Sequence, residues 1–196
     1  YSRFFMRAIA LCNNKIKLKE PFKGLFTQGM VCHETYRDKN EKWLSPDQIN
    51  KTKEGFISKI DGSKVKVGPS EAMSKSKKNI VDPESMIQVY GADAVRWFIL
   101  SDSPPERDVQ WSTEGVSAAH KFIQRIWNLN DKILSKKSKE INQIDEKKFF
   151  AKFNEYLFKI SDLIENFHLN VAVAKIYELT NLIENNLDKG ISASSL

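Results

Sequence analysis

Apolar residues in the second half of the chain recur every three or four positions, and this period constrains the fold more than any other feature. One run begins at Val116 and Ala119, a second at Phe149 and Phe153, and a third follows Asn170, which can cap a helix. Apolar side chains at this spacing gather on one face of an α-helix, and such faces must be buried against one another. The pattern therefore predicts three amphipathic helices that form an antiparallel bundle.

The first 110 residues show a mixed pattern. Residues 1–12 have helical spacing, whereas residues 22–34, FKGLFTQGMVCHE, are typical of a buried strand with a glycine where another backbone or a ligand comes close. A capping box from Ser45 to Gln48 predicts a short helix, and Asp61-Gly62 between two alternating segments predicts a β-hairpin. These signals favour an α/β part up to about residue 110, followed by an all-α part.

Two helices are expected at the end of the α/β part. Asp82 can cap the first, and Gly91 can close it in the left-handed conformation. Asp93 can cap the second helix, which Pro104-Pro105 would stop. The polar stretch at residues 71–82 lies before the first of these helices, so we expect it to be a loop.

The composition excludes few classes of protein. The 196 residues include a hydrophobic share of 41%, which allows one sizeable core or two small domains. A net charge of +6 fits a partner rich in phosphate, and it equally fits an ordinary lysine-rich surface. Neither Cys12 nor Cys32 has a partner at metal-ligand spacing, so no metal site and reduced thiols are expected. No apolar run approaches transmembrane length, so no membrane association is expected.

The stretch EAMSKSKKNIVDP, residues 71–83, is the strongest candidate for chemistry. Lysine carries a compact charge on a flexible stem, and serine hydroxyls and loop N–H groups can share the same phosphate oxygens. A helix N-terminus follows, and the apolar Met73 could hold the loop on the core or lie against a nucleotide ring. These parts suit a mobile clamp on a polyphosphate, although a basic surface loop would show the same residue types. Neither G-x-x-x-x-G-K-S/T nor G-x-G-x-x-G occurs in the chain.

The stretch AMSKSKKN resembles the K-M-S-K-S signature of the class I aminoacyl-tRNA synthetases. Its surroundings resemble bacterial leucyl-tRNA synthetase in the same order, from GLFTQGMVCHETY through VDPESMIQVYGADAVRWFILSDSPPERDVQW to FHLNVAVAKIYELTNLI. The resemblance covers nearly the whole chain and is weakest at residues 136–150. It implies the C-terminal part of a Rossmann-type catalytic domain followed by an anticodon-binding helical bundle.

The resemblance also implies an activity. Members of this family join leucine and ATP into leucyl-adenylate, with Mg²⁺, and transfer the leucyl group to tRNA(Leu) in the cytoplasm. By motif match Lys75 is the lysine that contacts ATP, Ser74 and Ser76 support the loop, and Met73 anchors it. Negative charge builds on the phosphates during this reaction, so a preorganised cation accelerates it.

The chain departs from the family pattern at two places. Ala72 stands where the general signature has its first lysine, so one cation is absent, and Lys77 or Lys78 could replace it. The second family signature, H-I-G-H, does not occur, and the three histidines stand in other contexts, as expected of packed or surface side chains. We therefore expect a piece of a longer ligase that would be inactive by itself.

The resemblance assigns domains as well. Residues 1–110 would be the end of the catalytic domain, with a connecting insertion at residues 32–71, and residues 111–196 would begin the anticodon-binding bundle. Lys121, Arg125 and Lys132 are candidate contacts to the tRNA backbone, although at helical spacing they could simply face solvent. Two alternatives remain open: a stand-alone RNA-binding module without catalysis, and a helical interaction domain.

Overall fold

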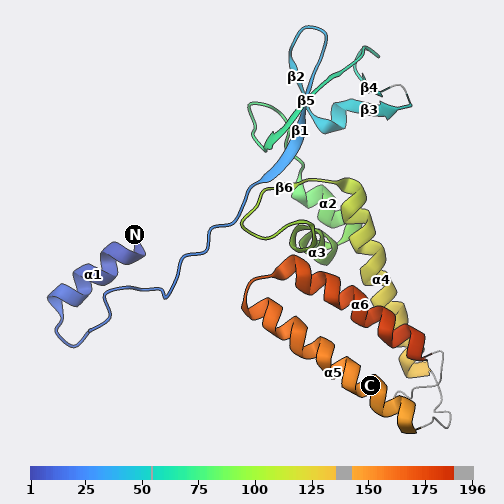
Figure 1. Ribbon diagram of the computed structural model, residues 1–196. Helices are drawn as coiled ribbons and strands as arrows, with labels where there is room; N and C mark the ends of the chain where they lie inside the picture. The colour runs from blue at the N-terminus through green and yellow to red at the C-terminus, as the bar shows by residue number, and fades with distance from the viewer. Residues whose placement is uncertain (54, 136–142, 188–196) are drawn as a thin grey trace.

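The structure, a computed structural model, describes residues 1–53, 55–135 and 143–187 (Figure 1). Strands and short helices occupy the first half of the chain, and long helices occupy the second half. The predicted order of an α/β part and then a helical part is therefore confirmed. None of the helices in the described ranges is long and apolar enough to cross a membrane.

The main sheet is built around strand β1 (Val31–Arg37). Strand β5 (Lys66–Ala72) pairs with it antiparallel along its length, and β2 (Trp43–Leu44) pairs antiparallel with its end. The short strand β6 (Val109–Gln110) pairs with its beginning and is parallel to it. The resemblance to a Rossmann-type domain implies a parallel sheet. Among the described strands, β1 and β6 pair in parallel, whereas β1 pairs antiparallel with β2 and β5.

The expectation of a buried strand at residues 22–34 is correct from Val31 onward and wrong before it. Leu25 is 90% exposed, and no described strand forms a ladder with residues 22–30, although the Met30 carbonyl at their end accepts the Val109 N–H of β6 at 2.9 Å. The predicted close approach is confirmed at Gly29, whose N–H donates to the Pro105 carbonyl at 2.8 Å. A Cβ at this position would stand 2.0 Å from the Arg107 carbonyl oxygen.

The hairpin predicted around Asp61-Gly62 forms over residues 56–58 and 63–65. Gly62 has a φ of +68°, as the turn requires, a bridge joins Ile57 to Lys64, and the Val65 N–H donates to the Phe56 carbonyl at 2.9 Å. Strand β4 (Gly55–Ser58) also pairs with β3 (Ile49–Thr52), and the hairpin ends where β5 turns away to pair with β1. Between β2 and β3 lies a single 3₁₀ turn, η1 (Pro46–Gln48), in which the Gln48 side chain accepts the Ser45 N–H as expected of a capping box.

Two short helices follow β5. Helix α2 (Pro83–Tyr90) begins as predicted, because the Asp82 carboxylate accepts the N–H groups of Glu84 and Ser85. Gly91 has the predicted positive φ, but its ψ of 153° lies outside the left-handed helical region. The cap predicted at Asp93 is wrong: helix α3 (Ala92–Asp102) starts one residue earlier, and Asp93 pairs with Arg96 in its first turn.

The three predicted long helices are present as α4 (Thr113–Ser135), α5 (Gln143–Glu165) and α6 (Leu169–Leu187). The core cluster lies where α3, β6 and α4 meet, and consists of Ala94, Phe98, Val109, Val116 and Ala119. Helix α3 also packs on α6, where the Trp97 indole N–H donates to the Tyr177 hydroxyl at 3.3 Å. Helix α3 thus packs against both α4 and α6 and connects these long helices to the sheet (Figure 1). The polar stretch at residues 135–148 has the composition of an irregular join, and this expectation is wrong from Gln143 onward, where α5 begins; residues 136–142 lie outside the described residues.

Helix α1 (Ser2–Cys12) forms where the helical spacing predicts it, but it has no buried residue. Figure 1 shows it apart from the rest of the fold, joined by residues 13–30, which form no helix or strand. Arg3 and Arg7 both pair with Glu20, so α1 folds back on its own connecting segment. The amphipathic pattern of this helix is therefore not explained by a buried face within the described residues.

Candidate functional site

The basic loop at residues 73–81 connects the end of β5 to the cap of α2. Its first residue still belongs to the sheet, because the Met73 N–H donates to the Val31 carbonyl at 3.2 Å. A tight turn follows, in which the Lys78 N–H donates to the Lys75 carbonyl at 3.3 Å. Lys78 has a φ of +55°, a conformation that non-glycine residues rarely adopt. The lysines therefore stand on a defined turn between a strand and a helix N-terminus.

Asn79 is the residue that fastens this turn to the sheet. Its side chain has no solvent exposure. The Oδ1 atom accepts the Ser74 N–H at 2.8 Å, and the Nδ2 group donates to the carbonyls of His33 and Glu71 at 3.2 and 3.1 Å. The sequence analysis assigns Asn79 to the basic loop and gives it no separate role. No sequence signal distinguishes it, apart from the apolar Ile80-Val81 that follows.

The two serines of the loop contact the turn and each other. The Ser74 hydroxyl accepts the Lys77 N–H at 3.4 Å and lies 3.3 Å from the Ser76 hydroxyl. The Ser74 hydroxyl therefore contributes to the turn, while the backbone N–H of Ser74 donates to Asn79. Met73 is half-buried beside them.

The lysines of the loop are not equivalent. Lys77 forms an ion pair with Glu71 at the end of β5, and both side chains are about one-third exposed at 39% and 35%. Lys75 and Lys78 are exposed, and no hydrogen bond or ion pair of their ammonium groups occurs within the described residues. Lys75 is therefore free to meet a ligand, and of the two possible replacements for the missing lysine at Ala72 only Lys78 is free.

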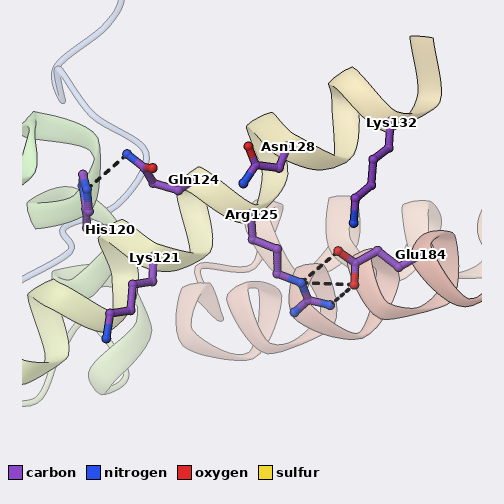
Figure 2. A pocket seen from close by; sticks show the side chains of 7 residues that line it. All are labelled: His120, Lys121, Gln124, Arg125, Asn128, Lys132 and Glu184. Atoms are coloured by element: carbon purple, nitrogen blue, oxygen red, sulfur yellow. Dashed lines mark hydrogen bonds and ion pairs between the residues drawn. The ribbon is translucent and has the colours of Figure 1, made fainter. Parts of the chain in front are cut away.

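A second polar site lies along α4 (Figure 2). A hollow on this helix is lined by His120, Lys121, Gln124, Arg125, Asn128 and Lys132, with Glu184 contributed by α6. Lys121 and Lys132 have ammonium groups without a described hydrogen bond or ion pair. The five cationic or amide groups on this face of α4 can bind an anion such as a phosphate.

Arg125 occupies a different role in this hollow. Its guanidinium is directed at Glu184 (Figure 2), with 3.0 Å between Nε and Oε1. It also donates to Oδ1 of Asn181 at 2.6 Å. The hydrogen bond from Arg125 is the main cause that lowers the pKa of Glu184, and the charge of Lys132 also lowers it. The pair ties α4 to α6. The candidate Arg125 is therefore engaged within the fold, unlike Lys121 and Lys132.

The histidines are dispersed among separate elements. His33 lies on β1, with Nδ1 2.9 Å from the Glu34 carbonyl oxygen. His120 lies on α4, where Nδ1 is 2.8 Å from the Tyr90 carbonyl oxygen and Nε2 is 3.2 Å from the Gln124 amide nitrogen. His168 is exposed at the turn between α5 and α6. The described residues bring together no three His, Cys, Asp or Glu side chains that could hold a metal ion.

Comparison with known proteins confirms the family resemblance. A model of the family described as tRNA synthetases class I (I, L, M and V) matches residues 52–112. The leucine–tRNA ligase of Zymomonas mobilis is 45% identical over 184 residues, and that of Rhodospirillum rubrum is 47% identical over 190 residues. These matches cover 94% and 93% of this chain. The chain spans only 21% and 22% of the length of these two relatives.

A solved structure gives the same result at the level of the fold. The leucyl-tRNA synthetase of Agrobacterium radiobacter, crystallised as a ternary complex named LeuRS–tRNA–LeuAMS, matches 100% of this chain with a TM-score of 0.67. The sequence identity in this match is 25%, and the match covers 21% of that protein. The chain is thus similar, over nearly its whole length, to one segment of leucine–tRNA ligases.

Proposed function

We propose that this chain is the segment of a leucine–tRNA ligase that supplies the ATP-phosphate loop and the first helices that bind tRNA. The observation that carries this proposal is the free Lys75 on a turn fixed by Asn79, within a stretch that matches the class I synthetase family. The relatives named leucine–tRNA ligase supply the substrate class. The segment would work within the cytoplasmic enzyme, beside the remainder of the same polypeptide.

The reaction explains why this loop needs a free cation. The leucine carboxylate attacks the α-phosphorus of ATP, the bond to the bridging oxygen breaks, and pyrophosphate leaves with the bonding electrons. Negative charge therefore grows on the phosphate oxygens. Lys75 would stabilise this charge, while Ser74 and Ser76 hold the turn that presents it and Met73 keeps the turn on the sheet. Lys78 could take part as a second free cation.

Mg²⁺ would act on the nucleotide rather than as a resident metal of this segment. The carboxylates nearest the loop already have partners, since Glu71 pairs with Lys77 and Asp82 caps α2. No three potential ligands converge within the described residues. We therefore derive no step of the mechanism through a metal held here.

The domain assignment follows the same proposal. Residues 1–110 would close the catalytic domain, with residues 32–71 as a connecting insertion, and residues 111–196 would begin the anticodon-side bundle. Lys121 and Lys132 would contact the phosphate backbone of tRNA(Leu), because their charges are free on one face of α4. Arg125 would contribute by holding α4 against α6, and a direct contact to RNA would require it to leave Glu184.

The direct test is the exchange of labelled pyrophosphate into ATP in the presence of leucine. Lys75→Ala, introduced into the full polypeptide that carries this segment, should lower the exchange rate about 100-fold or more, as expected for the loss of one preorganised charge. Lys64→Ala is the matched control, because Lys64 is also exposed and lies outside the loop. An unchanged exchange rate in Lys75→Ala would contradict the proposal.

A stand-alone RNA-binding module is the second candidate, and the free lysines of α4 favour it. The two functions differ in the mass of the native polypeptide, which an immunoblot of source cells measures. A band several times larger than 22.6 kDa supports the ligase. A band at 22.6 kDa would favour the RNA-binding module without catalysis. Leucyl-tRNA formation by the 196-residue chain alone would contradict our expectation that it is inactive in isolation.

A further inference from the structure

We infer that Asn79 is a positioning residue of the ATP-phosphate loop, which sets where Lys75 stands without touching the nucleotide itself. This inference rests on the proposed function. Asn79 follows the turn that carries Lys75, and it is one of the few fully buried polar side chains of the described residues. The motif that carries the family resemblance gives it no role.

The Asn79 carboxamide joins three separate segments at one point. One donor hydrogen of Nδ2 goes to the His33 carbonyl on β1 and the other to the Glu71 carbonyl on β5, at 3.2 and 3.1 Å. The Oδ1 atom accepts the N–H of Ser74, the residue immediately before Lys75, at 2.8 Å. The side chain therefore spans two neighbouring strands and fixes the entry to the turn relative to both of them.

The chemistry of these contacts selects an asparagine. Two carbonyl oxygens require two donors, and the Ser74 N–H requires an acceptor, which is the set that one carboxamide offers. In the reversed orientation of the amide, Oδ1 would lie against two carbonyl oxygens, which would be repulsive. The three partners therefore determine which amide atom is the oxygen and which is the nitrogen. An aspartate has the same shape but would bring a buried negative charge against two carbonyl groups.

The connection from Asn79 to Lys75 runs through Ser74. The Ser74 N–H is held by Asn79, and the Ser74 hydroxyl accepts the Lys77 N–H and contacts the Ser76 hydroxyl. The Lys78 N–H closes the turn on the Lys75 carbonyl. Loss of the carboxamide would release the first of these bonds and let the whole turn shift. A displacement of about 1 Å in a catalytic group can lower a rate about 100-fold.

The test compares Asn79→Ala and Asn79→Asp with Lys75→Ala in the full polypeptide. We expect both Asn79 variants to lower leucine-dependent ATP–pyrophosphate exchange about 10- to 100-fold, while KM for leucine stays within about twofold of wild type. Asn50→Ala is the matched control, because Asn50 is an exposed residue of β3 without a described side-chain hydrogen bond. A wild-type exchange rate in Asn79→Ala, with Lys75→Ala impaired, would overturn the inference and leave the proposed function intact.

Two further measurements do not depend on activity. Trypsin should cut after Lys75 or Lys78 several-fold faster in Asn79→Ala than in wild type. Without the Asn79 hydrogen bonds the turn opens locally more often, and the open segment can enter the active site of the protease. In the wild-type polypeptide the Ser74 amide should exchange its hydrogen at least about tenfold more slowly than the Ser76 amide, for which no backbone partner is described. Equal exchange at these two amides would overturn the inference even if the Asn79 variants fail to fold.

Discussion

The guanidinium of Arg125 on α4 is bonded to the carboxylate of Glu184 on α6, with 3.0 Å between Nε and Oε1. The side chains are 37% and 27% exposed, so the pair lies at the edge of the helix interface rather than in open solvent. Arg125 also reaches Asn181, one turn before Glu184 on the same helix. A residue that the sequence marks as a candidate RNA contact thus serves the packing of two helices.

This difference between Arg125 and its neighbours predicts how RNA binding responds to substitution. Lys121→Ala and Lys132→Ala should each weaken binding of tRNA and reduce the slope of log affinity against log salt concentration by about 1, as expected for one lost phosphate contact. Lys152→Ala on α5 is the matched control, because Lys152 is exposed outside the hollow. Fluorescence anisotropy over a salt series measures the slope. A slope equal to wild type in both α4 variants would contradict the RNA contact.

The same pair predicts a pH dependence of stability. The hydrogen bond from Arg125, followed by its charge, lowers the pKa of Glu184 against the opposing effect of burial. A lowered folded-state pKa means that the unfolded state binds the proton more readily, so this contribution is present above the unfolded pKa of about 4.3 and is lost as pH falls through the folded value. Urea unfolding should therefore show that wild type loses stability more steeply below about pH 4.3 than Glu184→Gln does. Parallel curves for the two proteins would refute the prediction.

The ion pair between Lys77 and Glu71 predicts unequal roles for the loop lysines. The Lys77 charge is already matched by Glu71 at the end of β5, whereas Lys75 has no such partner among the described residues. Lys77→Met should therefore lower ATP–pyrophosphate exchange by no more than about tenfold, against about 100-fold for Lys75→Ala. Lys78→Met serves as the comparison, because Lys78 is exposed and unpaired in the described structure. A loss in Lys77→Met as large as that in Lys75→Ala would show that the pair opens during the reaction.

The sequence predicts local structure well where the residues that determine an element lie within the element or directly beside it. Asp82 and Pro83 specify the start of α2 without help from the rest of the chain, and the helical period specifies α4 and α6. The pairing of β5 with β1 is different, because it joins residues about 35 positions apart. The alternating pattern around Asp61-Gly62 fits either pairing, so a local reading favours the hairpin.

The residues of the candidate sites differ in the same way in how well the sequence predicts their roles. Lys75 is recognisable from the sequence because a family motif surrounds it. Asn79 is not, since its role depends on the His33 carbonyl, 46 positions earlier, being brought beside the loop. The opposite holds for Arg125. Its charge suggests a ligand contact in the sequence, but in the structure it is paired with Glu184, which is distant in the sequence. Long-range partners decide whether a polar residue is free for function.

Gly29 provides a test of how residues 13–30 are held to the remainder of the fold. A Cβ on Gly29 would stand 2.0 Å from the Arg107 carbonyl oxygen, and backbone atoms cannot move aside as a side chain can, so Gly29→Ala should lower the free energy of unfolding by about 1 to 3 kcal/mol. Gly24→Ala is the matched control, because nothing lies within 4 Å of its added Cβ. Urea unfolding followed by tryptophan fluorescence measures both variants, and Trp111 directly follows β6, which bonds to the Met30 carbonyl next to Gly29. Equal midpoints for the two variants would contradict the close approach of the Gly29 and Arg107 backbones, whereas a lower midpoint in Gly29→Ala alone would support it.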